Sequence, residues 1–159
     1  MPRKAFETLL QEKAVSLLLV FNCILLVTSW VMSIVAYPHL PSAVPRVIDL
    51  LGRPRLMGQR SLLFFLSPAL QTGLFTACVW ASQKIARRRA ESRFKGPLIQ
   101  EAVFLMFIFV QLIFIHAQRT VIYLAHGVEK GFNPVYFYAL FLIILALIPY
   151  FRLRMKLRE

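Results

Sequence analysis

The stretch Ala14–Ala36, AVSLLLVFNCILLVTSWVMSIVA, contains 23 consecutive residues without a charged side chain. About 20 predominantly apolar residues in an α-helix cross the roughly 30 Å hydrocarbon core of a bilayer. The stretch is longer than the apolar core of a typical secretory signal, and the Tyr37-Pro38-His39 sequence after it offers no small-residue cleavage site. We therefore expect this stretch to remain in the protein as a membrane-spanning helix.

Three further stretches without Asp, Glu, Lys or Arg occupy residues 61–83, 102–118 and 131–151. The second of these has 17 residues and reaches spanning length when it includes Leu98 and Ile99. The sequence therefore predicts an all-α fold, a four-span transmembrane helical bundle. Because the spans use most of the chain, residues 1–159 are expected to form a single membrane domain. The predicted spans are approximately 14–36, 61–83, 98–119 and 133–151.

The composition excludes an ordinary soluble domain. Apolar residues make up 58% of the 159 residues and charged residues 16%, and the mean hydropathy is +0.65. The net charge of +12 would be compatible with nucleic-acid binding, but nucleic-acid-binding domains do not contain so high a fraction of apolar residues. We expect anionic lipid headgroups, not nucleic acid, to face the basic residues. Cys23 and Cys78 form no metal-ligand or redox motif, so we expect no metal and no cofactor.

The basic residues predict the orientation. Thirteen Lys and Arg residues lie in the N-terminal tail, the connection between spans two and three, and the C-terminal tail, whereas six lie in the other two connections. Because Lys and Arg concentrate on the cytoplasmic side, both termini are expected in the cytoplasm. The predicted location is the inner (plasma) membrane of a bacterium.

The connection after the first span, residues 37–60, is rich in proline. Prolines at positions 38, 41, 45 and 54 prevent a continuous helix, so the connection is expected to be ordered or extended. Gly52-Arg53-Pro54 predicts a turn. Two interpretations remain open: a stiff loop that holds two helices together, or a recognition element on the outward face.

This connection resembles a small bacterial membrane domain of unknown function, found alone and at the start of SdpI-type toxin-immunity proteins. Val47, Ile48 and Arg55 replace the histidine, aromatic and aspartate of the family pattern. The resemblance implies a multi-pass inner-membrane protein with a non-enzymatic accessory, protective or signalling role, whose partner is another membrane or secreted protein. The matching positions are Leu40, Pro41, Val44, Pro45, Gly52, Pro54, Gly58 and Arg60.

Three of the four predicted spans carry a polar stripe at helical spacing, and span four does not. Polar side chains are costly in lipid, so the stripes are expected to avoid it. They either form hydrogen bonds between helices at the centre of the bundle, or line a small polar cavity with Gln71, Gln111, Gln118 and His116. The stripes comprise Asn22, Ser29 and Ser33; Ser67, Gln71 and Cys78; and Gln100, Gln111 and Gln118.

His116, Arg119 and Tyr123 lie on successive turns near the end of the third predicted span. They are either packing and interface residues or an anion site, in which a guanidinium binds a phosphate or carboxylate. Arg119-Thr-Val-Ile-Tyr123 is similar to an element of membrane glutathione-transferase-like enzymes, although the family's element at the second span is missing. That resemblance implies an enzyme as one alternative, and a structural subunit of a membrane complex is another. The sequence points to no catalytic residue and leaves the enzymatic status open.

Overall fold

A computed structural model describes residues 2–48, 54–88, 95–128 and 134–157. Four long helices dominate these residues: α1 (Pro2–Ala36), α2 (Leu66–Arg88), α3 (Lys95–Ala125) and α4 (Pro134–Lys156). Each is long and apolar enough to cross a membrane. The predicted all-α, four-span bundle is confirmed, and the chain is a multi-pass membrane protein.

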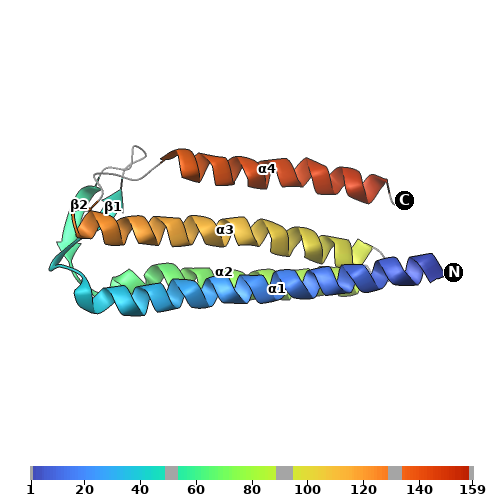
Figure 1. Ribbon diagram of the computed structural model, residues 1–159, viewed down its shortest axis with the longest axis horizontal. Helices are drawn as coiled ribbons and strands as arrows, with labels where there is room; N and C mark the ends of the chain where they lie inside the picture. Colours follow the sequence, from blue (N-terminus) through green and yellow to red (C-terminus); the bar gives the residue numbers. More distant parts are fainter. Residues whose placement is uncertain (1, 49–53, 89–94, 129–133, 158–159) are drawn as a thin grey trace.

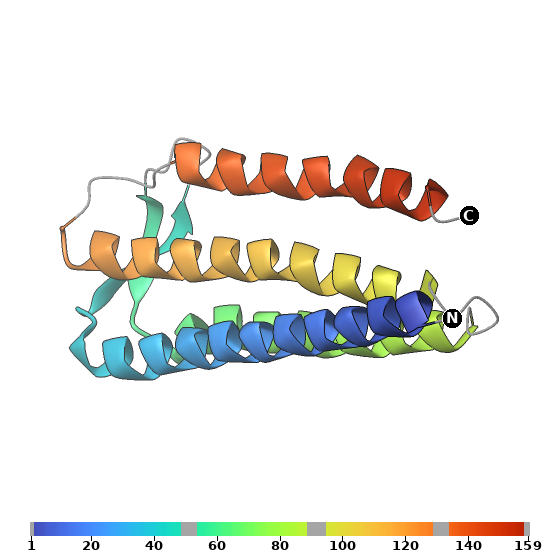
Figure 2. The ribbon, with the colours of Figure 1, turned by 45° about the vertical axis from the view of Figure 1, so that its right-hand side comes forward.

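The helices run side by side along one axis (Figures 1 and 2). Helices α1, α2 and α3 pack together, whereas α4 lies against α3. Both chain termini lie at one end of the bundle, and two short strands lie at the other (Figure 1). We call these the terminal end and the hairpin end.

The exposure of the side chains reverses the pattern of a soluble protein. Asn22, Ser29 and Gln111 are completely buried, whereas Leu17 and Val27 on α1 are 70% and 60% exposed. In water such a surface would be unstable, but in lipid the apolar side chains face hydrocarbon and the polar ones are sheltered. The fold is therefore built around a polar centre.

Helix α3 is the centre of the arrangement, because it packs against each of the other three helices. It begins three residues before and ends six residues after the predicted span 98–119. Its buried apolar side chains are Leu98, Phe104, Phe107 and Ile108. Helix α2 continues beyond residue 83 to Arg88, into the basic connection.

The proline-rich connection contains two antiparallel strands, whose pairing was not expected from the sequence. Strands β1 (Ala43–Ile48) and β2 (Pro54–Gln59) pair with Ala43 opposite Gln59 and Pro45 opposite Met57. Both strands of a two-stranded sheet are edge strands. Proline is accepted in an edge strand because an outward-facing position there needs no N–H for pairing. We call residues 43–59 the hairpin.

The hairpin is joined to the helices by two short 3-10 helices, η1 (Tyr37–His39) and η2 (Leu62–Phe65). Gly52 and Arg53 of the predicted turn lie outside the described residues, and Pro54 begins β2. The extended backbone expected from the prolines is therefore present, with cross-strand pairing in addition.

Candidate functional site

Arg60 ties the two ends of the proline-rich connection together. Its Nη1 donates hydrogen bonds to the carbonyl oxygens of Pro38 at 3.1 Å, Leu40 at 3.2 Å and Tyr37 at 3.5 Å. The guanidinium also lies 5.5 Å from the centre of the Tyr37 ring. In addition, the Arg60 backbone N–H donates to the carbonyl of Ser42 at 2.9 Å. One residue, directly after β2, thus holds η1 and the residues that lead into β1.

Aromatic side chains pack beneath this contact. The Tyr37 ring lies 5.0 Å from that of Phe65 and 6.2 Å from that of Phe64, and Phe65 also stacks on Trp30 at 6.3 Å. The Trp30 indole N–H donates to Thr72 Oγ1 on α2 at 3.0 Å. Trp and Tyr favour the boundary between hydrocarbon and headgroups, so this cluster is typical of the membrane interface.

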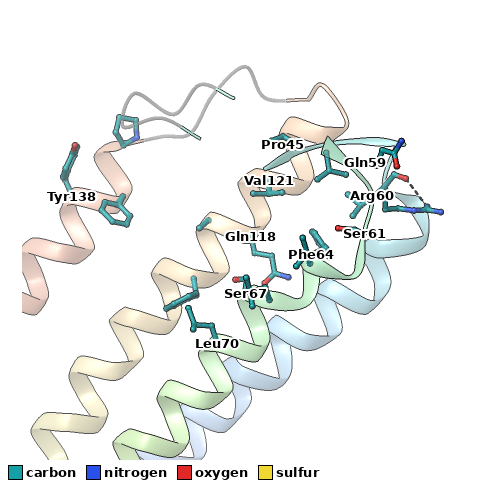
Figure 3. Close-up of a pocket in the computed structure, with 18 residues that line it drawn as sticks. Pro45, Gln59, Arg60, Ser61, Phe64, Ser67, Leu70, Gln118, Val121 and Tyr138 are labelled. Carbon is teal, nitrogen blue, oxygen red and sulfur yellow. Dashed lines mark hydrogen bonds between the residues drawn. The ribbon is translucent and has the colours of Figure 1, made fainter. Parts of the chain in front are cut away.

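A cavity of about 760 Å³ lies between the hairpin and the helices (Figure 3). This volume falls within the range of roughly 300–1,000 Å³ that is usual for small-molecule sites. Its walls are predominantly apolar. The lining residues are Leu40, Val44, Pro45, Gln59, Arg60 and Ser61 from the hairpin and its flanks; Leu63, Phe64, Leu66, Ser67 and Leu70 from η2 and α2; Phe114, Ala117, Gln118 and Val121 from α3; and Pro134, Phe137 and Tyr138 from α4.

Four of the eight positions at which the connection matches the pattern of the bacterial membrane domain lie at this cavity. Leu40, Val44, Pro45 and Arg60 line it, and Leu40 and Val44 are 4% and 8% exposed. Gly58 pairs with Val44 on the neighbouring strand, and Pro41 follows Leu40. Gly52 lies outside the described residues.

Gln118 connects the cavity to the polar centre of the bundle. Its Oε1 accepts a hydrogen bond from Ser29 Oγ at 3.1 Å, and its Nε2 donates to Ser33 Oγ. The side chain is 3% exposed. Figure 3 shows Gln118 projecting from α3 toward the side of α2 that carries Ser67. Two serines of α1 therefore hold an amide in the wall of the cavity.

A second polar group lies nearer the middle of the bundle and joins three helices. Gln71 Nε2 on α2 donates to Gln111 Oε1 on α3 at 3.0 Å, and Gln111 Nε2 donates to Asn22 Oδ1 on α1 at 2.8 Å. Asn22 Nδ2 then donates to the backbone carbonyls of Leu18 and Phe104 at 2.7 and 3.0 Å. All three amides are completely buried. The polar stripes of the first three spans thus meet and form hydrogen bonds between helices.

The structure does not gather the six predicted cavity or anion-site residues into one site. They are Gln71, Gln111, His116, Gln118, Arg119 and Tyr123. Gln118 lines the cavity, whereas Gln71 and Gln111 belong to the buried amide group. The ring of His116 packs against that of Tyr136 on α4 at 4.3 Å. The role of these residues as a ligand site remains a prediction.

The Arg119 and Tyr123 pair lies on α3 near the hairpin end. Arg119 is exposed and its guanidinium lies 4.8 Å from the centre of the Tyr123 ring, a cation–π distance. Neither residue lines the cavity. Nearby, His126 contacts the carbonyl of His39 through Nε2 at 3.0 Å, which joins the end of α3 to η1.

Several residues of the cavity were not identified from the sequence. Phe137 and Tyr138 lie in an apolar stretch where nothing distinguishes a cavity wall from a lipid-facing surface, and Phe114 follows the glutamine stripe of the third span, where its spacing indicates core packing. Another unpredicted contact joins α4 to α3 at the terminal end, where Arg154 Nη1 lies 2.6 Å from Glu101 Oε1. Among the described residues, no three or more His, Cys, Asp or Glu side chains lie together in a way that could hold a metal ion.

Comparison of the chain with protein-family models, with curated proteins and with solved structures finds no match.

Proposed function

We propose that the chain is a non-catalytic accessory protein of a bacterial inner membrane, with a protective or signalling role like that of SdpI-type proteins. It acts through the proline-rich hairpin, which engages another membrane or secreted protein. The observation that supports this most directly is that the proline-rich segment is a hairpin pinned by Arg60 over an apolar cavity. A rigid element offers a partner a preformed surface and loses little entropy on binding.

The chemistry of the cavity supports binding rather than catalysis. Its polar groups are the amides of Gln59 and Gln118, the hydroxyls of Ser61 and Ser67, the Tyr138 phenol and the Arg60 guanidinium. Amides and serine hydroxyls do not ionise near neutral pH and a guanidinium is always protonated, so the Tyr138 phenol is the one group among them with acid–base chemistry. The amides, the serine hydroxyls and the guanidinium orient a ligand and are poor general acids or bases.

The proposed orientation places the hairpin outside the cell. The terminal end and the connection between α2 and α3 carry most of the Lys and Arg residues, which favours the cytoplasmic side for both termini. The hairpin then faces the space in which a secreted toxin, or the outward part of a membrane partner, is accessible.

Site-specific photocrosslinking in intact cells tests the proposal. Met57 on β2 is 54% exposed, so a photoreactive residue there reaches a partner bound to the hairpin. The matched control is the same residue at Leu153, which is 60% exposed near the C-terminal end of α4. We expect a discrete protein adduct from position 57 and none of the same mass from position 153.

The Arg60→Gln variant completes this test. Loss of the carbonyl contacts releases the hairpin, so the adduct at position 57 should fall at least fivefold while the amount of protein in the membrane is unchanged. An absent adduct, or one that forms equally from Leu153, contradicts the proposed role of the hairpin.

A further inference from the structure

The cavity beneath the hairpin is bounded by three membrane-spanning helices and opens where lipid is available. Helices α2 and α4 both pack on α3, and each contributes one wall. Leu66 and Leu70 on α2 are 61% and 52% exposed, and Tyr138 on α4 is 52% exposed. Because these side chains lie on spanning helices, the exposed parts of the wall face the bilayer. Hydrocarbon chains can therefore enter sideways without crossing the headgroup layer.

The rim of the cavity at the hairpin end is polar and positively charged. Arg60 is exposed there, next to the aromatic cluster typical of the interface. The hydrogen bonds from its Nη1 go to the backbone carbonyls of Tyr37, Pro38 and Leu40, which carry no net charge and therefore do not neutralise the guanidinium. Guanidinium groups bind phosphate oxygens strongly, and phosphates lie at this depth of a bilayer.

We infer that the cavity binds one phospholipid of the surrounding membrane, with an acyl chain along the apolar walls and the phosphate at Arg60. An apolar chamber with a cationic rim at the interface matches the two parts of this molecule in order and polarity. The site does not depend on the proposed protein partner, since the lipid comes from the bilayer itself.

Native mass spectrometry of the full chain tests this inference. The protein is purified in detergent and mixed with vesicles of phosphatidylethanolamine and phosphatidylglycerol. We expect one phospholipid per chain to survive removal of the bulk lipid. Ala117→Phe places a large side chain in the cavity and should reduce this retention at least fivefold. The matched control, Ala146→Phe, adds the same group at an exposed position of α4 outside the cavity and should leave retention unchanged.

Two further variants keep the test decisive. Leu70→Trp fills the cavity from the half-exposed wall of α2, where no core must be repacked, and should give the same loss if Ala117→Phe does not insert. Arg60→Gln should weaken retention of both phospholipids at least threefold, because each phosphate loses its cationic partner and the hairpin wall of the cavity is released.

Three outcomes overturn the inference. They are equal retention in wild type and both filling variants, carry-over of detergent alone, and a two-chain species in place of bound lipid, which assigns the space to a second copy of the chain. Because the readout uses purified protein, its failure leaves the crosslinking result intact, and a missing crosslink leaves bound lipid intact.

Discussion

The buried amides hold α1, α2 and α3 together through pairs of complementary groups. Each amide offers both a donor and an acceptor, so Gln111 accepts from Gln71 and donates to Asn22. In lipid these contacts add specificity between apolar helices that otherwise resemble one another in composition. Gln71 Oε1 is buried and has no hydrogen-bond partner among the described residues. The group is therefore not satisfied equally at its two ends.

This asymmetry predicts unequal costs for two similar substitutions. Gln111→Leu breaks two hydrogen bonds between helices and should reduce stability by roughly 1–2 kcal/mol, at about 0.6 kcal/mol per contact plus the cost of stranded partners. Gln71→Leu breaks one and removes the unpaired oxygen, so its cost should be less than half as large. Unfolding by sodium dodecyl sulfate in mixed micelles measures both values. Equal losses would show that the amide chain does not bear the stability.

At the scale of elements, Arg60 decides whether the hairpin stays docked. Charge-assisted hydrogen bonds contribute roughly 1.5–3 kcal/mol each when buried and less when exposed, so Arg60→Gln should weaken docking by about 1–2 kcal/mol. A tenfold change corresponds to about 1.4 kcal/mol, so protease cleavage within residues 43–59 should accelerate about tenfold. Arg60→Lys keeps the positive charge but lacks the planar guanidinium with its several fixed N–H donors, and should give an intermediate cleavage rate. Unchanged cleavage in both variants would mean that the strands alone fix the hairpin.

The attachment of α4 involves a second local contact. Glu101 and Arg154 form an ion pair at 2.6 Å, with side chains 16% and 30% exposed. Exposed pairs contribute below about 1 kcal/mol and buried pairs lose more when one partner is removed, so a partly buried pair should show a coupling energy of about 1–2 kcal/mol.

A double-mutant cycle checks this value. Glu101→Arg and Arg154→Glu should each destabilise the protein, and the double variant should recover much of the loss because opposite charges face each other again. The measurement is the same mixed-micelle unfolding. Additive losses in the double variant would show that the two residues act independently.

At the scale of the whole molecule, the four helices place both termini at one end and the hairpin at the other (Figure 1). The proposed orientation predicts opposite accessibility of these ends. In a chain with Cys23 and Cys78 replaced by alanine, Ser42→Cys should react with a membrane-impermeant maleimide on intact cells. Ser92→Cys should react only after permeabilisation, because six basic residues surround it between positions 84 and 95. The reverse pattern of labelling would invert the orientation.

The polar stripes show which contacts can be predicted from helical spacing alone. Asn22, Ser29 and Ser33 share a face of the first span, and this spacing predicts contact with other polar stripes, which the structure contains. His116 lies on a different face of α3 from Gln111 and Gln118, and it packs on Tyr136 of α4. Angular position identifies a sheltered face, but it does not identify which neighbouring helix covers that face.

The number of membrane helices and their approximate positions followed from the charge-free apolar runs, because such a run in lipid must satisfy its own backbone hydrogen bonds and forms a helix. The helices α1 and α3 extend well beyond these runs. Only the tertiary structure decided that the proline-rich segment pairs as two strands, that Arg60 closes it, and that Phe114, Phe137 and Tyr138 surround one cavity. These features join residues far apart in the chain. The side chains of Phe137 and Tyr138 stand in an apolar run, and no periodic pattern there separates a cavity wall from a surface in contact with lipid.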